Sequence, residues 1–267
     1  MKSQELKNIV KEKYSEIATQ SKEQNENSCC GSTSCCDDLD YTIFSDDYTE
    51  LEGYNPDADL GLGCGLPTQH AGILPGHRVL DLGSGAGNDC FVARTLVGPT
   101  GHVTGLDFTD AMLDKARLNL DKTGFTNIDF VKGDIENIPL PDASYDVIIS
   151  NCVLNLVPDK KKAFSEIYRI LKPGGHFNIS DVVLEGNLPD KLKEVAEMYA
   201  GCVSGAIQRK DYLNLIDLQG FNTIEVKSQK QVEIPNSIHL NYISLDELRA
   251  LKKSKVGIFS ITVNAIK

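Results

Sequence analysis

Apolar and polar positions follow two different periods through the middle of the chain. Short runs that are apolar or that alternate predict five strands, over residues 78–82, 102–107, 128–131, 145–150 and 176–181. Apolar positions at helical spacing predict helices between them, over residues 88–96, 109–119 and 160–171. The segment Lys172-Pro-Gly-Gly175 predicts a turn before the fifth strand. Strands that alternate with helices form a mostly parallel sheet, so we expect an α/β fold.

The pattern changes at both ends of the chain. An amphipathic helix is predicted over residues 4–19, followed by a polar loop over 21–52. After the fifth strand, helical spacing predicts helices over 188–200, 211–218 and 244–253, and strand patterns cover 221–226 and 258–266. These last two strands are expected to form an antiparallel pair at the sheet edge. The sequence thus predicts three regions: 1–60 (helix and arm), 61–185 (α/β domain) and 186–267 (C-terminal region).

A glycine-rich turn follows the first strand, in the pattern Asp81-x-Gly83-x-Gly85-x-Gly87. Glycines let the backbone turn tightly and approach a ligand closely, and the next helix points its free N–H groups at that ligand. A dinucleotide fingerprint requires a glycine at position 88, where this chain has asparagine. The turn resembles instead the first motif of the class I S-adenosylmethionine (SAM) methyltransferases, in which the Asp81 carboxylate can accept from the ammonium of SAM. The alternative is an ordinary tight turn between strand and helix.

This resemblance implies a Rossmann-like class I methyltransferase sheet with an antiparallel edge, and a SAM site at the carboxyl ends of its strands. Asp107 ends the second strand, where an acid can accept hydrogen bonds from both ribose hydroxyls. A plain acid at a helix start is the alternative for Asp107. The resemblance places adenine contacts at Gly133-Asp134-Ile135. The expected SAM-binding residues are Asp81, Gly83, Ser84, Gly85, Gly87, Asp107, Phe108, Asp134, Ile135 and Asn151.

Composition and charge narrow the possible partners. The chain of 267 residues is 41% hydrophobic, has no apolar run of transmembrane length, and begins with a polar, mixed-charge segment. We therefore expect a cytoplasmic protein without a membrane partner. The net charge of −11, with no cluster of Lys and Arg, argues against nucleic acid. The five histidines lack the spacing of paired metal ligands, which disfavours histidine-based zinc chemistry.

Eight cysteines in a chain expected in the cytoplasm are unlikely to form a disulfide framework, because that compartment keeps thiols reduced. Cys90, inside a predicted helix, fits a small buried apolar residue. Cys64 lies in a glycine-rich loop, Cys152 follows the fourth strand and Cys202 follows the fifth, so these three thiols can converge beside the SAM methyl group. The polar arm holds two vicinal pairs, Cys29-Cys30 and Cys35-Cys36. Metalloid capture and redox exchange explain these pairs, and incidental thiols in a solvated arm are the alternative.

Three segments around the cysteines carry a more specific resemblance. Gly63-Cys64-Gly-Leu-Pro, Asn151-Cys152-Val-Leu-Asn-Leu and Tyr199-Ala-Gly-Cys202 resemble the arsenite SAM methyltransferases, from about residue 8 to near the end. The resemblance implies that Cys64, Cys152 and Cys202 hold trivalent arsenic and that Cys36 is a further redox cysteine. It also implies arsenite, methylarsonite or a thiol conjugate of arsenic as substrate, and a thiol reductant such as glutathione or thioredoxin.

Elementary chemistry agrees with this interpretation. Arsenite is neutral and thiophilic at pH 7, so an acidic protein can bind it with soft thiolates and without a basic pocket. Methyl transfer to an arsenic lone pair needs no general base, and positioning alone can contribute roughly 7–11 kcal/mol to catalysis. Two alternatives remain: an O- or C-methyltransferase of a small metabolite in which the cysteines only pack, and a non-catalytic thiol sensor of metalloid or zinc.

Overall fold

The computed structural model describes residues 3–20, 47–187, 203, 205–232, 244–254 and 256–267. Several sequence expectations lie outside these residues. They are the helix over 188–200 and the roles of Cys29, Cys30, Cys35, Cys36 and Cys202.

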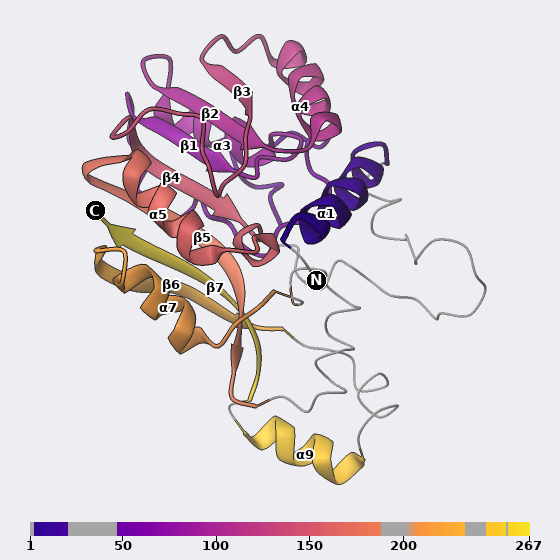
Figure 1. The fold of residues 1–267 in the computed structure, drawn as a ribbon. Coiled ribbons are helices and arrows are strands. Elements are labelled where there is room, and N and C mark those ends of the chain that lie inside the picture. Colours follow the sequence, from indigo (N-terminus) through magenta and orange to yellow (C-terminus); the bar gives the residue numbers. More distant parts are fainter. Residues whose placement is uncertain (1–2, 21–46, 188–202, 204, 233–243, 255) are drawn as a thin grey trace.

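One seven-stranded sheet organises the described residues, in the order β3-β2-β1-β4-β5-β7-β6 (Figure 1). The strands are β1 (Arg78–Leu82), β2 (His102–Asp107), β3 (Ile128–Lys132), β4 (Tyr145–Asn151), β5 (Leu171–Glu185), β6 (Asn222–Gln231) and β7 (Gly257–Ile266). The first five strands in this order, β3, β2, β1, β4 and β5, are parallel, and β7 is antiparallel to both of its neighbours. The chain therefore has the predicted class I methyltransferase sheet with its antiparallel edge.

Both faces of the sheet are covered, as its apolar strands require. The helices are α1 (Ser3–Ala18), α3 (Asn88–Val97), α4 (Asp110–Thr123), α5 (Lys160–Ile170), α7 (Arg209–Asp217) and α9 (Leu245–Lys253), with a 3-10 turn η2 (Leu154–Leu156). Alternation along β1 sends Leu80 and Leu82 into one core with Phe164 of α5. Val79 enters the opposite core, where Phe91 of α3 packs. The period of two in the sequence thus becomes two apolar layers on either side of one sheet.

Strand β5 differs most from its prediction. The sequence predicts a turn at 172–175 and a strand over 176–181, whereas the structure shows one strand, Leu171–Glu185. Leu171 pairs with Tyr145 before the register shifts, and regular pairing resumes at His176 with Val147. The expected turn is therefore a bulge, in which Gly174 has a φ of +78°. The other end of β5 is longer because β7 pairs with it as far as Gly257.

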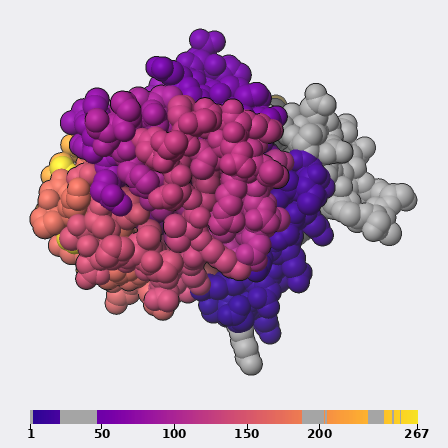
Figure 2. All heavy atoms as spheres, turned by 90° about the horizontal axis from the view of Figure 1, so that it is seen from above, coloured from indigo at the N-terminus to yellow at the C-terminus, as the bar shows by residue number. Residues whose placement is uncertain are grey.

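Helix α1 lies beside α4 over the carboxyl ends of the strands (Figures 1 and 2). Lys7 pairs with Asp134 at 2.6 Å and with Glu136 at 2.5 Å, and Lys11 pairs with Asp110 at 3.1 Å. The amphipathic pattern over 4–19 is confirmed as a helix that packs on the α/β domain. Among the described residues, no helix is at once long enough and apolar enough to cross a membrane.

Candidate active site

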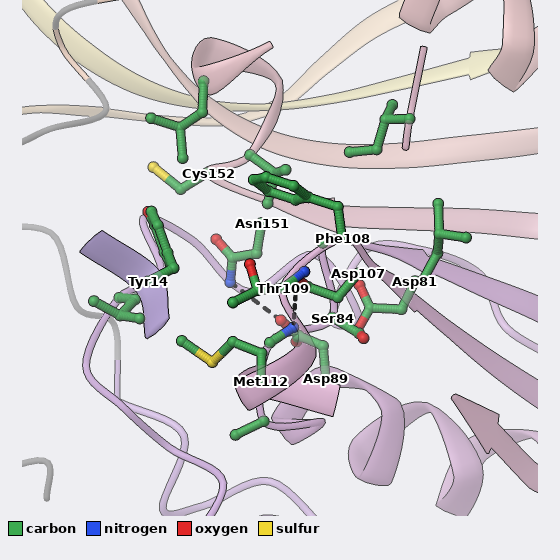
Figure 3. A pocket seen from close by; sticks show the side chains of 18 of the residues that line it. Tyr14, Asp81, Ser84, Asp89, Asp107, Phe108, Thr109, Met112, Asn151 and Cys152 are labelled. Atoms are coloured by element: carbon green, nitrogen blue, oxygen red, sulfur yellow. Dashed lines mark hydrogen bonds between the residues drawn. The ribbon is translucent and has the colours of Figure 1, made fainter. Parts of the chain in front are cut away.

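A cavity opens at the carboxyl ends of β1, β2 and β4, with α1 on one side (Figure 3). Its wall includes most of the sequence-predicted site residues: Asp81, Gly83, Ser84, Gly85, Asp107, Phe108, Asp134, Ile135, Asn151 and Cys152. Gly87 and Cys64 lie behind this wall. A Cβ on Gly87 would come within 2.8 Å of the Phe130 ring, so this glycine permits core packing.

The glycine turn is held by main-chain hydrogen bonds. The N–H groups of Gly83 and Ser84 both donate to Leu106 O, at 2.7 and 3.0 Å. Gly83 has a φ of +71°, and a Cβ there would lie 2.5 Å from Val153 Cγ2. A side chain at position 83 is therefore excluded both by backbone conformation and by the residue after Cys152.

Three polar side-chain atoms on the cavity wall are buried without a hydrogen-bond partner among the described residues. They are Ser84 Oγ, Asn88 Oδ1 and Thr109 Oγ1. Buried polar groups normally have partners, so three orphaned atoms around one cavity indicate a polar ligand. The hydroxyl, amine and carboxylate groups of SAM match such a wall.

Asp107 ends β2 with its carboxylate at the cavity, as predicted. Its Oδ2 accepts from Gly85 N at 3.0 Å and its Oδ1 from Thr109 N at 2.8 Å. Burial raises the pKa of Asp107, although these backbone N–H groups oppose the shift. The carboxylate is thereby oriented, and its remaining lone pairs can accept from a bound ribose.

Asp81 is 2% exposed and accepts a hydrogen bond from Cys90 Sγ at 3.2 Å. Burial raises the pKa of Asp81 well above its ordinary value, and the charge of Asp89 adds to this shift. Cys90 is fully buried, which confirms the prediction that it packs as a small apolar residue, while its bond to Asp81 was not predicted. Two buried carboxylates at one cavity favour a cationic ligand.

Sequence reasoning missed the polar residues that surround Asp89. Tyr48 Oη donates to Asp89 at 3.0 Å, and Asn151 Nδ2 donates to it at 3.2 Å. Burial raises the pKa of Asp89, and these two donors oppose the shift. The partners are 41 and 62 residues distant in sequence, so no local pattern could have joined them.

Helix α1 contributes Lys7, Val10 and Tyr14 to the cavity wall, and these residues were also missed. A signal was present, because the helical stripe that includes Val10 and Tyr14 requires an apolar partner. The sequence does not say which surface that partner occupies.

A buried apolar cluster that contains sulfur adjoins the cavity at Cys152. Cys64 and Cys152 are 1% and 3% exposed and belong to one apolar cluster, completed by Val182, Leu184, Val203, Ala206 and Ile258. Asn151 Oδ1 accepts from Cys64 N at 2.9 Å, and Ser260 Oγ donates to Cys64 O. Cys152 donates its N–H to Ser180 O at 2.8 Å and has a φ of +60°. The structure therefore brings these two thiols, 88 positions apart, into one cluster, as the sequence predicts.

The segment that follows Cys202 also reaches this cluster. Val203 is 1% exposed there, and a Cβ on Gly205 would lie only 1.8 Å from Asn155 O. The backbone at Gly205 thus packs directly on η2, at the residue three positions after Cys152. Cys202 itself lies outside the described residues.

Asp181 is buried next to Val182 of the same cluster, and Tyr212 Oη donates to its Oδ2 at 3.2 Å. Burial raises the pKa of Asp181 to about 7, although the Val182 N–H, the charge of Lys160 and the Tyr212 hydroxyl oppose it. The sequence reasoning placed Asp181 at a strand end and assigned it no role.

Comparison with known proteins identifies the family. A family model described as "Methyltransferase domain" matches residues 73–220. The arsenite methyltransferase of Halobacterium salinarum is 41% identical over 239 residues, which cover 84% of this chain and 59% of that protein. The crystal structure of an arsenic(III) S-adenosylmethionine methyltransferase from Chlamydomonas reinhardtii aligns with a TM-score of 0.64 at 38% identity, covering 77% of this chain and 67% of that one. The chain belongs to the arsenite methyltransferase family.

A second family member, the arsenite methyltransferase of Aquipseudomonas alcaligenes, is 41% identical over 182 residues, which cover 66% of this chain and 52% of that protein. The chain thus spans between half and three fifths of the length of these two curated relatives.

Proposed function

We propose that this chain transfers a methyl group from SAM to trivalent arsenic held by cysteine thiolates. One observation carries the proposal: Cys152 lies in the wall of the cavity that the glycine turn forms, and it shares an apolar cluster with Cys64. The names of the relatives point to the same reaction. Arsenite is the first substrate under this proposal and methylarsonite the second.

The SAM side of the cavity, defined here as the wall made by residues 81–89, 106–109 and 133–135, has groups suited to each part of the methyl donor. Asp107 would accept from the ribose, and Asp81 with Asp89 would face the methionine end, which carries both the ammonium and the sulfonium of SAM. Asp134 and Ile135 would border the adenine. When bound, SAM supplies a methyl group on a sulfonium. The methyl group would leave without the electrons of its bond to sulfur, so the other product is the neutral thioether S-adenosylhomocysteine.

The thiol side, defined here as Cys64, Cys152 and the five apolar residues of their cluster, would bind the substrate. Each As–OH group of arsenite exchanges with a thiol, forming one As–S bond and releasing one water, so no net proton is lost. Thiols from Cys64, Cys152 and Cys202 would leave the arsenic lone pair available for the methyl carbon. The apolar residues around the thiols would exclude water, which would otherwise compete with the thiols for arsenic.

Methyl transfer formally oxidises arsenic by two electrons, and a pair of thiols that closes to a disulfide can return them. Cys36 is our candidate for one of these thiols, and glutathione or thioredoxin is the class of external reductant that would reopen the disulfide. The chain would act in the cytoplasm, where such reductants keep thiols reduced.

Incubation with SAM, arsenite and glutathione tests the proposal, with S-adenosylhomocysteine and methylated arsenic measured by mass spectrometry. We expect arsenite-dependent turnover in the wild type. In Cys152→Ser, arsenite-dependent turnover should fall roughly 100-fold or more, because the positioning of the methyl acceptor is lost. SAM affinity, measured on the same variant by calorimetry, should stay within about twofold because the SAM side is intact. Unchanged turnover in Cys152→Ser, or turnover that does not require arsenite, would reject the proposal.

A further inference from the structure

A buried hydrogen-bond network joins the helix after the glycine turn to the loop that carries Cys64. Its centre is Asp89 on α3, which accepts from Tyr48 Oη at 3.0 Å and from Asn151 Nδ2 at 3.2 Å. Asp89 and Tyr48 are 8% and 6% exposed. Asp89 therefore connects the first turn of α3 to Asn151 at the end of β4 (Figure 3). It also connects α3 to Tyr48.

Asn151 carries the connection onward to Cys64. Its Oδ1 accepts from Cys64 N at 2.9 Å, while its two Nδ2 hydrogens are shared among Tyr48 Oη at 2.7 Å, Gly65 O at 2.9 Å and Asp89. A Cβ on Gly63 would lie 2.7 Å from Asn151 Nδ2, so the loop packs tightly on this amide. The main chain on both sides of Cys64 is thus positioned by one carboxamide, and that carboxamide is oriented by Asp89.

The charge balance around Asp89 is incomplete. Asp81 and Asp89 both line the cavity and are both buried. In the described part of the cavity wall the only Lys, Arg or His is Lys7, and its ammonium pairs with Asp134 and Glu136. A cationic ligand would stabilise the ionised form of Asp89. An ionised carboxylate in turn accepts stronger hydrogen bonds from Tyr48 and Asn151 than a neutral one does.

We infer that Asp89 is a positioning residue that couples the positive charge of the bound methyl donor to the placement of Cys64. The inference rests on the proposed function and adds to it a link between the two halves of the site. The sulfonium of the donor strengthens the Asp89–Asn151 contact, and Asn151 then holds the Cys64 main chain in place for arsenic. Methyl transfer leaves a neutral thioether, so the same link weakens once the product has formed.

Arsenite titration by calorimetry tests the coupling without turnover. One arm contains saturating sinefungin, an analogue with a protonated amine in place of the sulfonium methyl group, and the other contains S-adenosylhomocysteine, which lacks that charge. In the wild type we expect arsenite to bind about fivefold or more tightly with sinefungin. Asp89→Asn keeps the size of the side chain and removes its charge, so the ratio of affinities should fall to within about twofold.

Two further variants separate coupling from folding. Tyr48→Phe removes one donor to Asp89 and should lower the ratio while leaving a folded chain, so it replaces Asp89→Asn if that variant does not fold. Asp146→Asn is the matched control, because Asp146 lies at the opposite end of β4 and bonds only Arg78 N and Lys172 among the described residues. It should keep the wild-type ratio.

The outcomes are distinct. A wild-type ratio near one, or a wild-type ratio retained in Asp89→Asn, would overturn the coupling while the methyltransferase proposal stands. A wild type that does not bind arsenite, or whose affinity is unchanged by Cys152→Ser, would reject the proposed function and this inference with it.

Discussion

The SAM side of the cavity and the thiol side, which adjoins it at Cys152, differ in how they are built. On the SAM side, main-chain groups and buried polar atoms make the wall, and Ser84, Asn88 and Thr109 present polar atoms that have no hydrogen-bond partner in the part of the chain that the structure describes. On the thiol side, apolar side chains surround two sulfurs that are almost fully buried. The first side suits a polar, cationic ligand that enters and leaves, and the second suits a soft, neutral atom that bonds directly to the chain. Under the proposed function, the methyl donor and the arsenic would therefore bind to different groups and not compete.

The largest effect is expected from a change to the backbone of the SAM side. Gly83→Ala places a Cβ at a φ of +71° and 2.5 Å from Val153 Cγ2. Strain and overpacking together should lower the free energy of unfolding by roughly 2–4 kcal/mol. SAM affinity should fall as well, because the turn must move. Urea unfolding and calorimetry with SAM measure the two effects.

Gly124→Ala provides the control for this prediction. Gly124 has a φ of +71° and lies in the left-handed region, but nothing among the described residues lies within 4 Å of its Cβ position. The variant should lower the free energy of unfolding by only about 1–2 kcal/mol, from backbone strain, and leave SAM affinity unchanged. Equal effects of the two variants would mean that contact with Val153 does not shape the SAM side.

The next effect concerns the thiol side alone. Methylated arsenic has only two exchangeable positions, so Cys64→Ser should spare methylarsonite more than arsenite. We expect the loss of kcat/KM to be about tenfold greater with arsenite, equivalent to about 1.4 kcal/mol. Steady-state assays with each substrate measure the ratio. Cys152→Ser serves as the comparison, because it should impair both substrates, and equal losses in Cys64→Ser would contradict the assignment.

The smallest effect comes from the helix that flanks the SAM side. Lys7→Gln removes the pairs with Asp134 and Glu136, which are partly exposed and screened. Such pairs contribute roughly 0.2–1 kcal/mol, so the KM for SAM should rise about two- to fivefold at low salt. The difference from wild type should shrink at high salt. Lys122→Gln, which breaks an exposed pair with Asp57, is the control. An equal rise in the KM for SAM in this variant would mean that the pairs made by α1 do not contribute specifically to SAM binding.

The same contrast explains what could be predicted from the sequence. The strands, the helices that alternate with them and the SAM side follow from local patterns, because a glycine turn and a strand-end acid are encoded within about 30 residues. The thiol side could be proposed because Cys152 directly follows a strand, while the segments that carry Cys64 and Cys202 can fold over the same edge of the sheet. In the structure, Cys64 and Cys152 do share a cluster. The roles of all these residues remain predictions.

Long-range contacts explain what was missed. The Asp89 network joins residues 41 and 62 positions apart, and Lys7 reaches Asp134 across 127 positions. Neither contact has a local sequence pattern, because each depends on how the loops and α1 pack on the folded sheet. The length of β5 has the same origin, because pairing with β7 extends it to Glu185.

Cys152 shows what the thiol side costs the fold. It is one of three non-glycine residues with positive φ in the described chain, and a left-handed backbone costs such a residue about 1–2 kcal/mol. Glycine would adopt this conformation freely. Cys152→Gly would relieve this strain and remove a buried side chain from the cluster at once, so under the proposed function any relief of backbone strain at position 152 comes with the loss of an arsenic ligand.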